Sequence, residues 1–236
     1  MTSPESTLED APVVDRDFAE TFLCNIDDPV KTHVMGMFHE WWEVAPQAAI
    51  DQYLELFRSI PGATDFLAER HLPEPLRLDD LADYEPGTLG AAYRDFIVDN
   101  DLMANLATNY RTLHDSLGAD GRLDRMPDDL RYTVVRGFML HDFVHTITAN
   151  APDIRGELVV AGFHYGQILF PYHAFRVAVT TGHVALVNPR GIPMVMDAFT
   201  EGWSAGRRWK NLHFTKWEEQ LDRSLDDIRA EYGGSE

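Results

Sequence analysis

Two histidines and two carboxylates lie close together in the sequence, at spacings that are typical of a metal site. His141 and Asp142 are followed by His145, and Glu157 comes after eleven intervening residues. Residues at i and i+4 of a helix share one face, so both imidazoles would point the same way. Together with the two carboxylates they form a nitrogen and oxygen donor set. Such a set favours Zn²⁺ first, with Fe²⁺ or Mn²⁺ as alternatives, whereas Mg²⁺ and Ca²⁺ prefer oxygen ligands throughout.

The same histidines also have a purely structural interpretation, as hydrogen-bonded core residues with Asp142 as a local partner. They lie on a stripe that should face the core, with steps of four, three, four and three: Val134, Phe138, His141, His145 and Thr148. A buried polar group without a partner costs about 1–3 kcal/mol, so imidazoles on this stripe need a ligand or a hydrogen bond. The presence of Glu157 on the next predicted helix favours the metal.

Three further residues are candidates for supporting roles. His164 shares a helix face with Glu157 and could donate a hydrogen bond to a ligand or carry a proton. Arg136 precedes His141 by five residues, and Arg155 lies just before Gly156. Either arginine could bind an anionic group of a substrate near the metal, although a solvated arginine is an equally good interpretation.

The sequence pattern around these residues is helical. Pro127 and Asp128 are typical of a helix start, and the pattern predicts a helix over 128–149 that carries both histidines. The Pro- and Gly-containing loop 149–156 would let the next helix, headed by Glu157, fold back antiparallel. Aromatic and methionine side chains nearby are either core or the walls of a tunnel for an apolar tail: Phe138, Met139, Phe143, Phe163, Phe170 and Tyr172.

Helical signals also dominate the rest of the chain. Further helices are predicted over 27–42, 46–60, 88–100 with Thr88 as N-cap, 103–117, 153–187 with an interruption at Pro171, 189–208 and 217–232, with a helical turn at 78–84. No convincing strand pattern or internal repeat is visible. Residues 1–16 have the Ser, Thr, Pro and acid content of a flexible tail. We therefore predict that 17–236 form a single-domain, all-α helical bundle, with a metal site between two adjacent antiparallel helices.

Composition restricts the function further. With 236 residues, of which 44% are hydrophobic, the chain can bury one full core. Acidic residues outnumber basic ones by 39 to 20, and a net charge of −19 repels phosphate backbones and anionic headgroups, which argues against nucleic acid binding. The single cysteine, Cys24, excludes an internal disulfide and a Cys-rich zinc site. The absence of a long apolar segment favours a cytoplasmic protein that contacts membranes peripherally. A homodimer is possible.

These residues resemble the Coq4 family of coenzyme Q (ubiquinone) biosynthesis proteins. The family signature, HDxxH followed after eleven residues by Glu, stands here as His141 to His145 and Glu157. Three further segments are similar in order and spacing: 84–93 (YEPGTLGAAY), 156–160 (GELVV), and Gly206-Arg207-Arg208 leading to Lys216-Trp217-Glu218. The resemblance covers about residues 78–232. The family usually has an apolar residue where this chain has Arg155.

The resemblance implies a function as well as a fold. Coq4 proteins are all-helical, associate peripherally with membranes, organise other quinone-biosynthesis enzymes, and are implicated in oxidative decarboxylation at ring carbon C1 of a polyprenyl-benzoate. Carried over by position, His141, Asp142, His145 and Glu157 become the ligands of a divalent metal. The implied partners are a prenylated aromatic lipid and the other enzymes of the pathway.

Two other functions stay open from the sequence. The protein could be a non-catalytic scaffold that binds a prenyl lipid and has a structural metal. It could also be a zinc hydrolase, because HDxxH is similar to the HExxH of zincins. The hydrolase ranks last, because aspartate reaches less far than glutamate toward a metal-bound water.

Overall fold

The computed structural model describes residues 16–27, 42, 45–106, 108–119, 121 and 123–233. These residues form α-helices, three short 3-10 helices and no β-strand, which confirms the predicted all-α class. The α-helices are α1 (Arg16–Asp27), α3 (Gln47–Arg58), α4 (Ala63–Glu69), α5 (Leu89–Asp99), α6 (Met103–Leu106), α7 (Tyr110–Leu117), α8 (Asp128–Thr148), α9 (Ile154–Ile168), α10 (Pro171–Val187), α11 (Ile192–Arg208) and α12 (Leu225–Tyr232). The 3-10 helices are η2 (Leu78–Leu81), η3 (Pro189–Gly191) and η4 (Trp217–Glu219).

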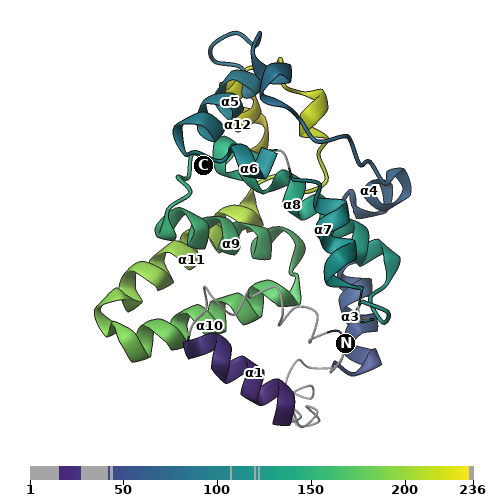
Figure 1. Ribbon diagram of the computed structural model, residues 1–236, viewed down its shortest axis with the longest axis vertical. Coiled ribbons are helices and arrows are strands. Elements are labelled where there is room, and N and C mark those ends of the chain that lie inside the picture. Colours follow the sequence, from purple (N-terminus) through teal and green to yellow (C-terminus); the bar gives the residue numbers. More distant parts are fainter. Residues whose placement is uncertain are drawn as a thin grey trace.

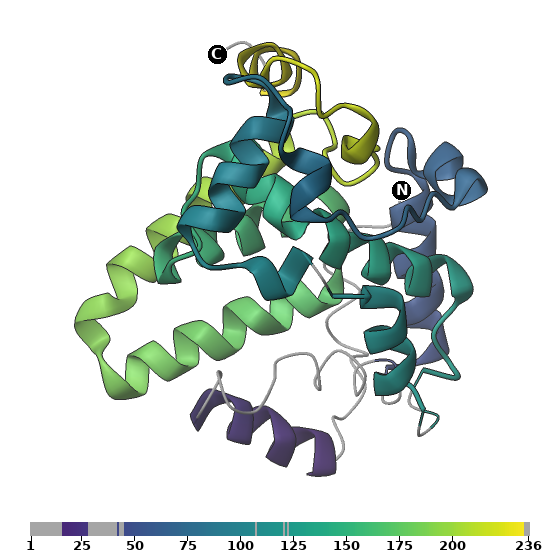
Figure 2. The ribbon, with the colours of Figure 1, turned by 45° about the horizontal axis from the view of Figure 1, so that its top comes forward.

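The long helix α8 is the centre of the arrangement, and it contacts α4, α5, α7, α9 and α12 (Figure 1). Two hydrophobic clusters meet it: Leu130 and Val134 belong to one, and Leu140, Phe143 and Val144 to the other. The helices α9, α10 and α11 form a second group on one side of α8, and α1 packs against α10 (Figure 2). The histidine-bearing helix is therefore buried between several partners, which limits the motion of its side chains.

The helix α9 packs along α11, and four glycines make this approach possible. They are Gly162 and Gly166 on α9 and Gly202 and Gly206 on α11. A Cβ at Gly202 would collide with the carbonyl oxygen of Val159, so only glycine lets the two backbones touch. The sequence predicted an antiparallel partnership of α9 with α8. In the structure α9 makes few contacts with α8 and packs mainly against α11.

The loop between α8 and α9 is built by specific residues. Ala149 ends α8 in the left-handed region with φ 56°, and the Asp153 side chain caps α9 by accepting a 2.8 Å hydrogen bond from the Gly156 backbone. A Cβ at Gly156 would collide with the carbonyl oxygen of Ala151. This tight loop places Glu157 in the first turn of α9.

Several predicted boundaries are confirmed. The helices α8, α5 with its Thr88 cap, and the α9–α10 break before Pro171 lie where the sequence placed them, and η2 is the predicted helical turn. The predicted tail 1–16 lies outside the described residues except for Arg16, which begins α1. The predicted helix over 27–42 likewise lies outside them, apart from its two ends.

Two predicted helices are wrong in detail. The predicted helix over 103–117 is divided into α6 and α7, because the Asn109 side chain accepts a 3.1 Å hydrogen bond from the Thr112 backbone and starts a new helix. The predicted helix over 217–232 is η4 followed by α12, which begins at Leu225 and is capped in a similar way by the Ser224 side chain. The short α4 was not predicted. Among the described residues, no helix is both long and apolar enough to cross a bilayer.

Candidate metal centre

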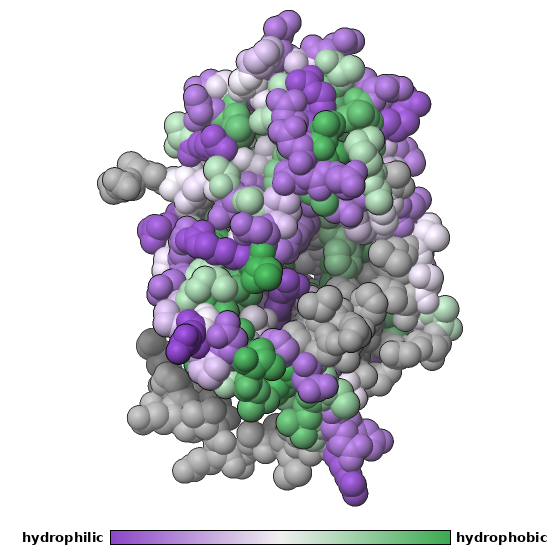
Figure 3. Space-filling model, turned by 60° about the vertical axis from the view of Figure 1, so that its left-hand side comes forward, coloured by the Kyte–Doolittle hydropathy of each residue, from purple (hydrophilic) through white to green (hydrophobic). Residues whose placement is uncertain are grey.

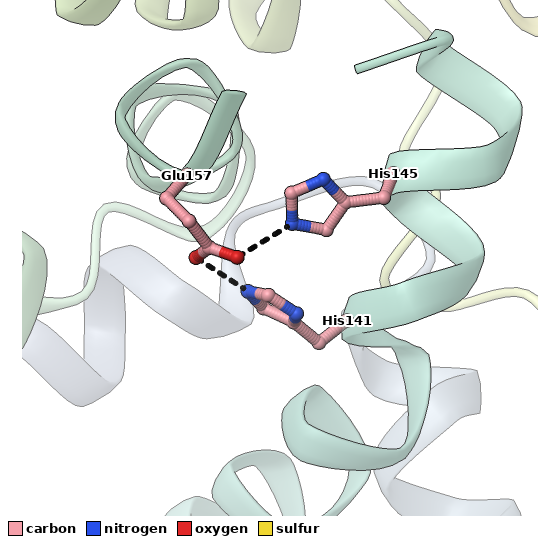
Figure 4. Close-up of side chains that lie close together, drawn as sticks. All are labelled: His141, His145 and Glu157. Carbon is pink, nitrogen blue, oxygen red and sulfur yellow. Dashed lines mark ion pairs between the residues drawn. The ribbon is translucent and has the colours of Figure 1, made fainter. Parts of the chain in front are cut away.

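His141, His145 and Glu157 meet in the space between α8 and α9. One ligand atom from each lies within 4.8 Å of the others. The Nε2 atom of His145 is 3.3 Å from Oε1 of Glu157, and Nε2 of His141 is 3.6 Å from Oε2 (Figure 4). Three of the four ligands predicted from the sequence are therefore brought together by the fold.

The His145 side chain is held in an orientation that suits cation binding. Its Nδ1–H donates a 3.0 Å hydrogen bond to the carbonyl oxygen of Asn150, which leaves Nε2 as the ring nitrogen that can offer a lone pair to a metal ion. That Nε2 atom is buried, the side chain is 0% exposed, and no hydrogen-bond partner is present for it in the described part of the chain. A buried nitrogen without a partner is costly, and a metal ion would remove this cost, so the residues fit a divalent ion.

Asp142 is placed differently from the other predicted ligands. Its Oδ1 lies 3.3 Å from Nδ1 of His141, and its Oδ2 accepts a 3.3 Å hydrogen bond from Asn105 Nδ2. The carboxylate therefore contacts the ring nitrogen opposite the one that approaches Glu157. In this position it fixes the orientation and tautomer of His141, as carboxylates beside metal-binding histidines do.

The carboxylates also control the charge of the centre. Burial lowers the pKa of His141, but Asp142 and Glu157 outweigh it and raise that pKa to about 9. Burial raises the pKa of Glu157, but its approach to His141 and His145 outweighs burial and holds that pKa well below its usual range. Without an ion, the proton on His141 therefore compensates the negative charge of one carboxylate. A divalent cation would replace this proton.

A cavity of about 280 Å³ lies next to His141 and Glu157. It is lined by side chains from α8, α9 and α10, including His141, and the α9 residues in its wall are Glu157, Ala161, His164 and Ile168. Phe143 and Phe163 belong to the core, and Phe138, Phe170 and Tyr172 line the cavity while also packing in the core cluster of Leu130 and Val134.

His164 lies beside the centre, next to His141. Its ring stacks on His141 with centroids 6.0 Å apart and on His173 with centroids 5.8 Å apart. Burial, with smaller contributions from neighbouring histidines, holds the pKa of His164 well below its usual value, so the ring is neutral. Gly137 of α8 leaves room for His213, whose Cε1 would lie 3.0 Å from a Cβ there.

Neither arginine singled out in the sequence faces the cavity. Arg136 is 1% exposed and forms a bidentate ion pair with Glu218, with distances of 2.6 and 2.8 Å. Arg155 pairs with Glu201 of α11 at the surface. The arginine of the cavity is Arg176, which the sequence analysis missed. The signal that could have found it is the spacing of Tyr172, His173 and Arg176, which share one face of a helix.

Fold and site together define an all-α protein with a candidate divalent-metal centre beside a largely apolar cavity. The family model "Coenzyme Q (ubiquinone) biosynthesis protein Coq4" matches residues 43–235, so this chain belongs to the Coq4 family. The match confirms the resemblance and reaches further toward the N-terminus than residues 78–232.

Individual proteins that are similar to this chain have names of the same family. The chain is 23% identical to "Ubiquinone biosynthesis protein coq-4, mitochondrial" of Neurospora crassa, over 92% of this chain and 58% of that protein. It is 24% identical to "Ubiquinone biosynthesis protein coq4, mitochondrial" of Talaromyces marneffei, over 45% of this chain and 36% of that protein. The chain thus spans little more than half the length of the first relative. A crystal structure of a Nostoc punctiforme protein has the same fold, with a TM-score of 0.69 at 20% identity over 92% of this chain and 94% of that one.

Proposed function

We propose that this protein takes part in ubiquinone biosynthesis by a metal-dependent oxidative decarboxylation at ring carbon C1 of a polyprenyl-benzoate. The observation that carries the proposal is the buried Nε2 atom of His145, which has no hydrogen-bond partner among the described residues and faces Glu157. Family membership supplies the pathway. The adjacent cavity supplies a place for an aromatic ring.

In this proposal His141, His145 and Glu157 hold the ion, with Zn²⁺ the first choice and Fe²⁺ or Mn²⁺ as alternatives. When bound, the ion would act as a Lewis acid that stabilises negative charge on a substrate oxygen as carbon dioxide leaves. Asp142 and the Asn150 carbonyl would hold the two imidazoles in their binding orientations. Both ring positions are already fixed in the folded chain, so little reorganisation accompanies binding.

The other cavity residues would hold the substrate and its protons. Phe138 and Phe170 provide apolar walls that exclude water from the ring. His164, neutral and stacked on His141, is placed to carry a proton. Replacement of the C1 carboxylate by oxygen removes two electrons from the ring, so a two-electron oxidant must be supplied as a co-substrate.

An exposed apolar tip supports peripheral contact with a membrane. Leu186 and Val187 at the end of α10 are 75% and 61% exposed, and the start of α11 adds Ile192, Met194 and Met196. Figure 3, which turns the α10 and α11 side forward, shows apolar residues gathered in patches among hydrophilic ones. Exposed apolar patches of this kind mark lipid or protein contacts, and this one would suit a prenylated substrate or another enzyme of the pathway.

The same tip favours a second candidate function, a non-catalytic scaffold that binds a prenyl lipid and uses the metal for stability. The zinc hydrolase is not favoured, because Asp142, the residue that would have to act on water, contacts His141 Nδ1 and Asn105 instead. The two remaining candidates, the decarboxylase and the scaffold, differ because only the decarboxylase would convert a substrate.

A single assay separates them. Metal-loaded protein is incubated with 3-geranyl-4-hydroxybenzoate labelled with ¹³C at the carboxyl carbon, with dioxygen, and released ¹³CO₂ is measured by mass spectrometry. The decarboxylase predicts metal-dependent release that His145→Ala abolishes. Stoichiometric metal and lipid binding without any release would support the scaffold, and protein that retains no divalent ion after metal loading would contradict both.

A further inference from the structure

Among the described residues that line the cavity there is one arginine, Arg176, and its guanidinium has only weak contacts. Arg176 lies on α10, its side chain is 30% exposed, and it lines the cavity with Tyr172 and His173. Its Nη2 is 3.9 Å from Oε2 of Glu157, which is beyond hydrogen-bond distance, and its Nη1 donates a long 3.4 Å hydrogen bond to the Tyr172 hydroxyl. A guanidinium has five N–H donors, and among the described residues only one of them makes a hydrogen bond, so the others are free to bind a ligand.

The other two arginines considered for this role are committed elsewhere. Arg136 is buried in its bidentate pair with Glu218, and Arg155 pairs with Glu201 on the surface. By contrast, Arg176 is placed beside the candidate metal centre, on the same cavity as His141.

A second polar group on the same wall, a ring nitrogen of His173, has no hydrogen-bond partner among the described residues. The Nδ1 atom of His173 is buried and makes no hydrogen bond within the described residues. Burial, with a smaller contribution from Arg176, lowers the pKa of His173 to about 3, so the ring is neutral near pH 7 and can donate one hydrogen bond. Arginine and histidine are three positions apart on α10 and share a face.

The charges of the cavity also favour an anion. Its lining contains two carboxylates, Asp142 and Glu157, and one guanidinium, and its histidines would be neutral with a metal bound. A divalent ion would therefore give the lining a net positive charge, on a protein whose overall charge is −19. A planar guanidinium binds a carboxylate through two parallel hydrogen bonds, which a point charge cannot do.

We propose that Arg176, assisted by His173, binds the carboxylate of an aromatic acid in the cavity beside the metal centre. The assignment rests on the proposed function and makes it more specific, because it names the residue that selects an acid over a neutral phenol. It places the carboxylate at the α10 wall and the ring between Phe138 and Phe170.

The test is binding, without turnover. Zinc-loaded protein is titrated with 4-hydroxybenzoate and, separately, with phenol, by ligand-observed NMR, and zinc content is measured on the same samples. Wild-type protein should prefer 4-hydroxybenzoate. Arg176→Gln should lower that affinity roughly ten- to a hundred-fold, the range for loss of a hydrogen-bonded charge, with little change for phenol. Arg176→Lys should lie between, and His173→Phe should lose a few-fold.

The matched control is Arg208→Gln, which removes an exposed arginine at the end of α11, outside the cavity lining. It should bind both probes as the wild type does. Equal affinity of wild type and Arg176→Gln for 4-hydroxybenzoate would overturn the proposal, as would a wild type that does not distinguish the two probes. Loss of zinc from Arg176→Gln would also overturn it, because Arg176 would then act on Glu157. Arg176-dependent binding without decarboxylation would leave this inference standing and remove the proposed reaction.

Discussion

The Nε2 atom of His145 lies 3.3 Å from Oε1 of Glu157, and the two residues come from different helices, α8 and α9. The opposite ring nitrogen of His145 is held by the Asn150 carbonyl, so the approach to Glu157 is fixed by the loop that joins the helices. The second histidine, His141, lies beside this pair, with its Nε2 atom 3.6 Å from Oε2 of Glu157.

Removal of His145 should abolish metal retention. His145→Ala deletes a buried ligand and leaves His141 and Glu157, which are too few to hold zinc tightly. Elemental analysis after gel filtration should show one divalent ion per wild-type chain and almost none in the variant. His183→Ala, which removes a histidine bonded to the Ile26 carbonyl, should keep its metal. A variant at position 145 with full metal content would refute the site.

Asp142→Asn should weaken metal binding without eliminating it. The structure places this carboxylate on Nδ1 of His141, and loss of such a partner typically costs about 10–100-fold in metal affinity. Competition with a chelator measures the change, and Asp128→Asn, at the exposed start of α8, is the control. Complete loss of stoichiometric metal would instead restore Asp142 as the fourth ligand that the sequence predicted.

Gly202→Ala should destabilise the fold. A Cβ there would collide with the Val159 carbonyl oxygen, so α9 and α11 must move apart, at a cost of about 1–3 kcal/mol in the free energy of unfolding. Urea denaturation measures this cost, and Ser204→Ala on the same helix should change stability much less. An unchanged midpoint for Gly202→Ala would mean that the helices do not approach as described.

Stability should fall in mild acid through His213. Burial is the main cause that lowers the pKa of His213 to about 4, whereas an unfolded chain has a value near 6.5. The unfolded state therefore binds the proton first, so stability is intact above pH 6.5 and declines as pH falls toward 4, by about 3 kcal/mol in total. His213→Gln should flatten this part of the profile in urea unfolding from pH 7 to 4.5. Equal slopes for variant and wild type would exclude His213 as a cause.

The apolar tip should bind neutral lipid. Each exposed apolar side chain gains about 1.5–3 kcal/mol on full burial, so Leu186→Glu with Val187→Glu should reduce co-flotation with phosphatidylcholine vesicles at least about tenfold. Leu56→Glu, an exposed leucine of α3, is the control. Equal flotation of the double variant and the control would place the membrane contact elsewhere.

Much of the fold follows from local signals in the sequence. Pro127 and the acids after it start α8, Thr88 caps α5, and Pro171 separates α9 from α10, and each acts within a few residues of its own position. The break between α6 and α7 at Asn109 was not predicted, because asparagine is common both in loops and at helix caps. Periodicity alone does not separate these two roles.

Helical periodicity and short-range capping are enough to predict the all-α class, the shared face of His141 and His145, and the position of Glu157 at the head of the next helix. Three other features could not be predicted in this way: Asp142 contacts His141 and does not join the three gathered ligands, Arg136 pairs with Glu218, and Arg176 lines the cavity. Those outcomes depend on how α9, α10 and α11 pack, which residues far apart in the chain determine together. A helical pattern fixes which side chains share a face, but packing decides what that face meets.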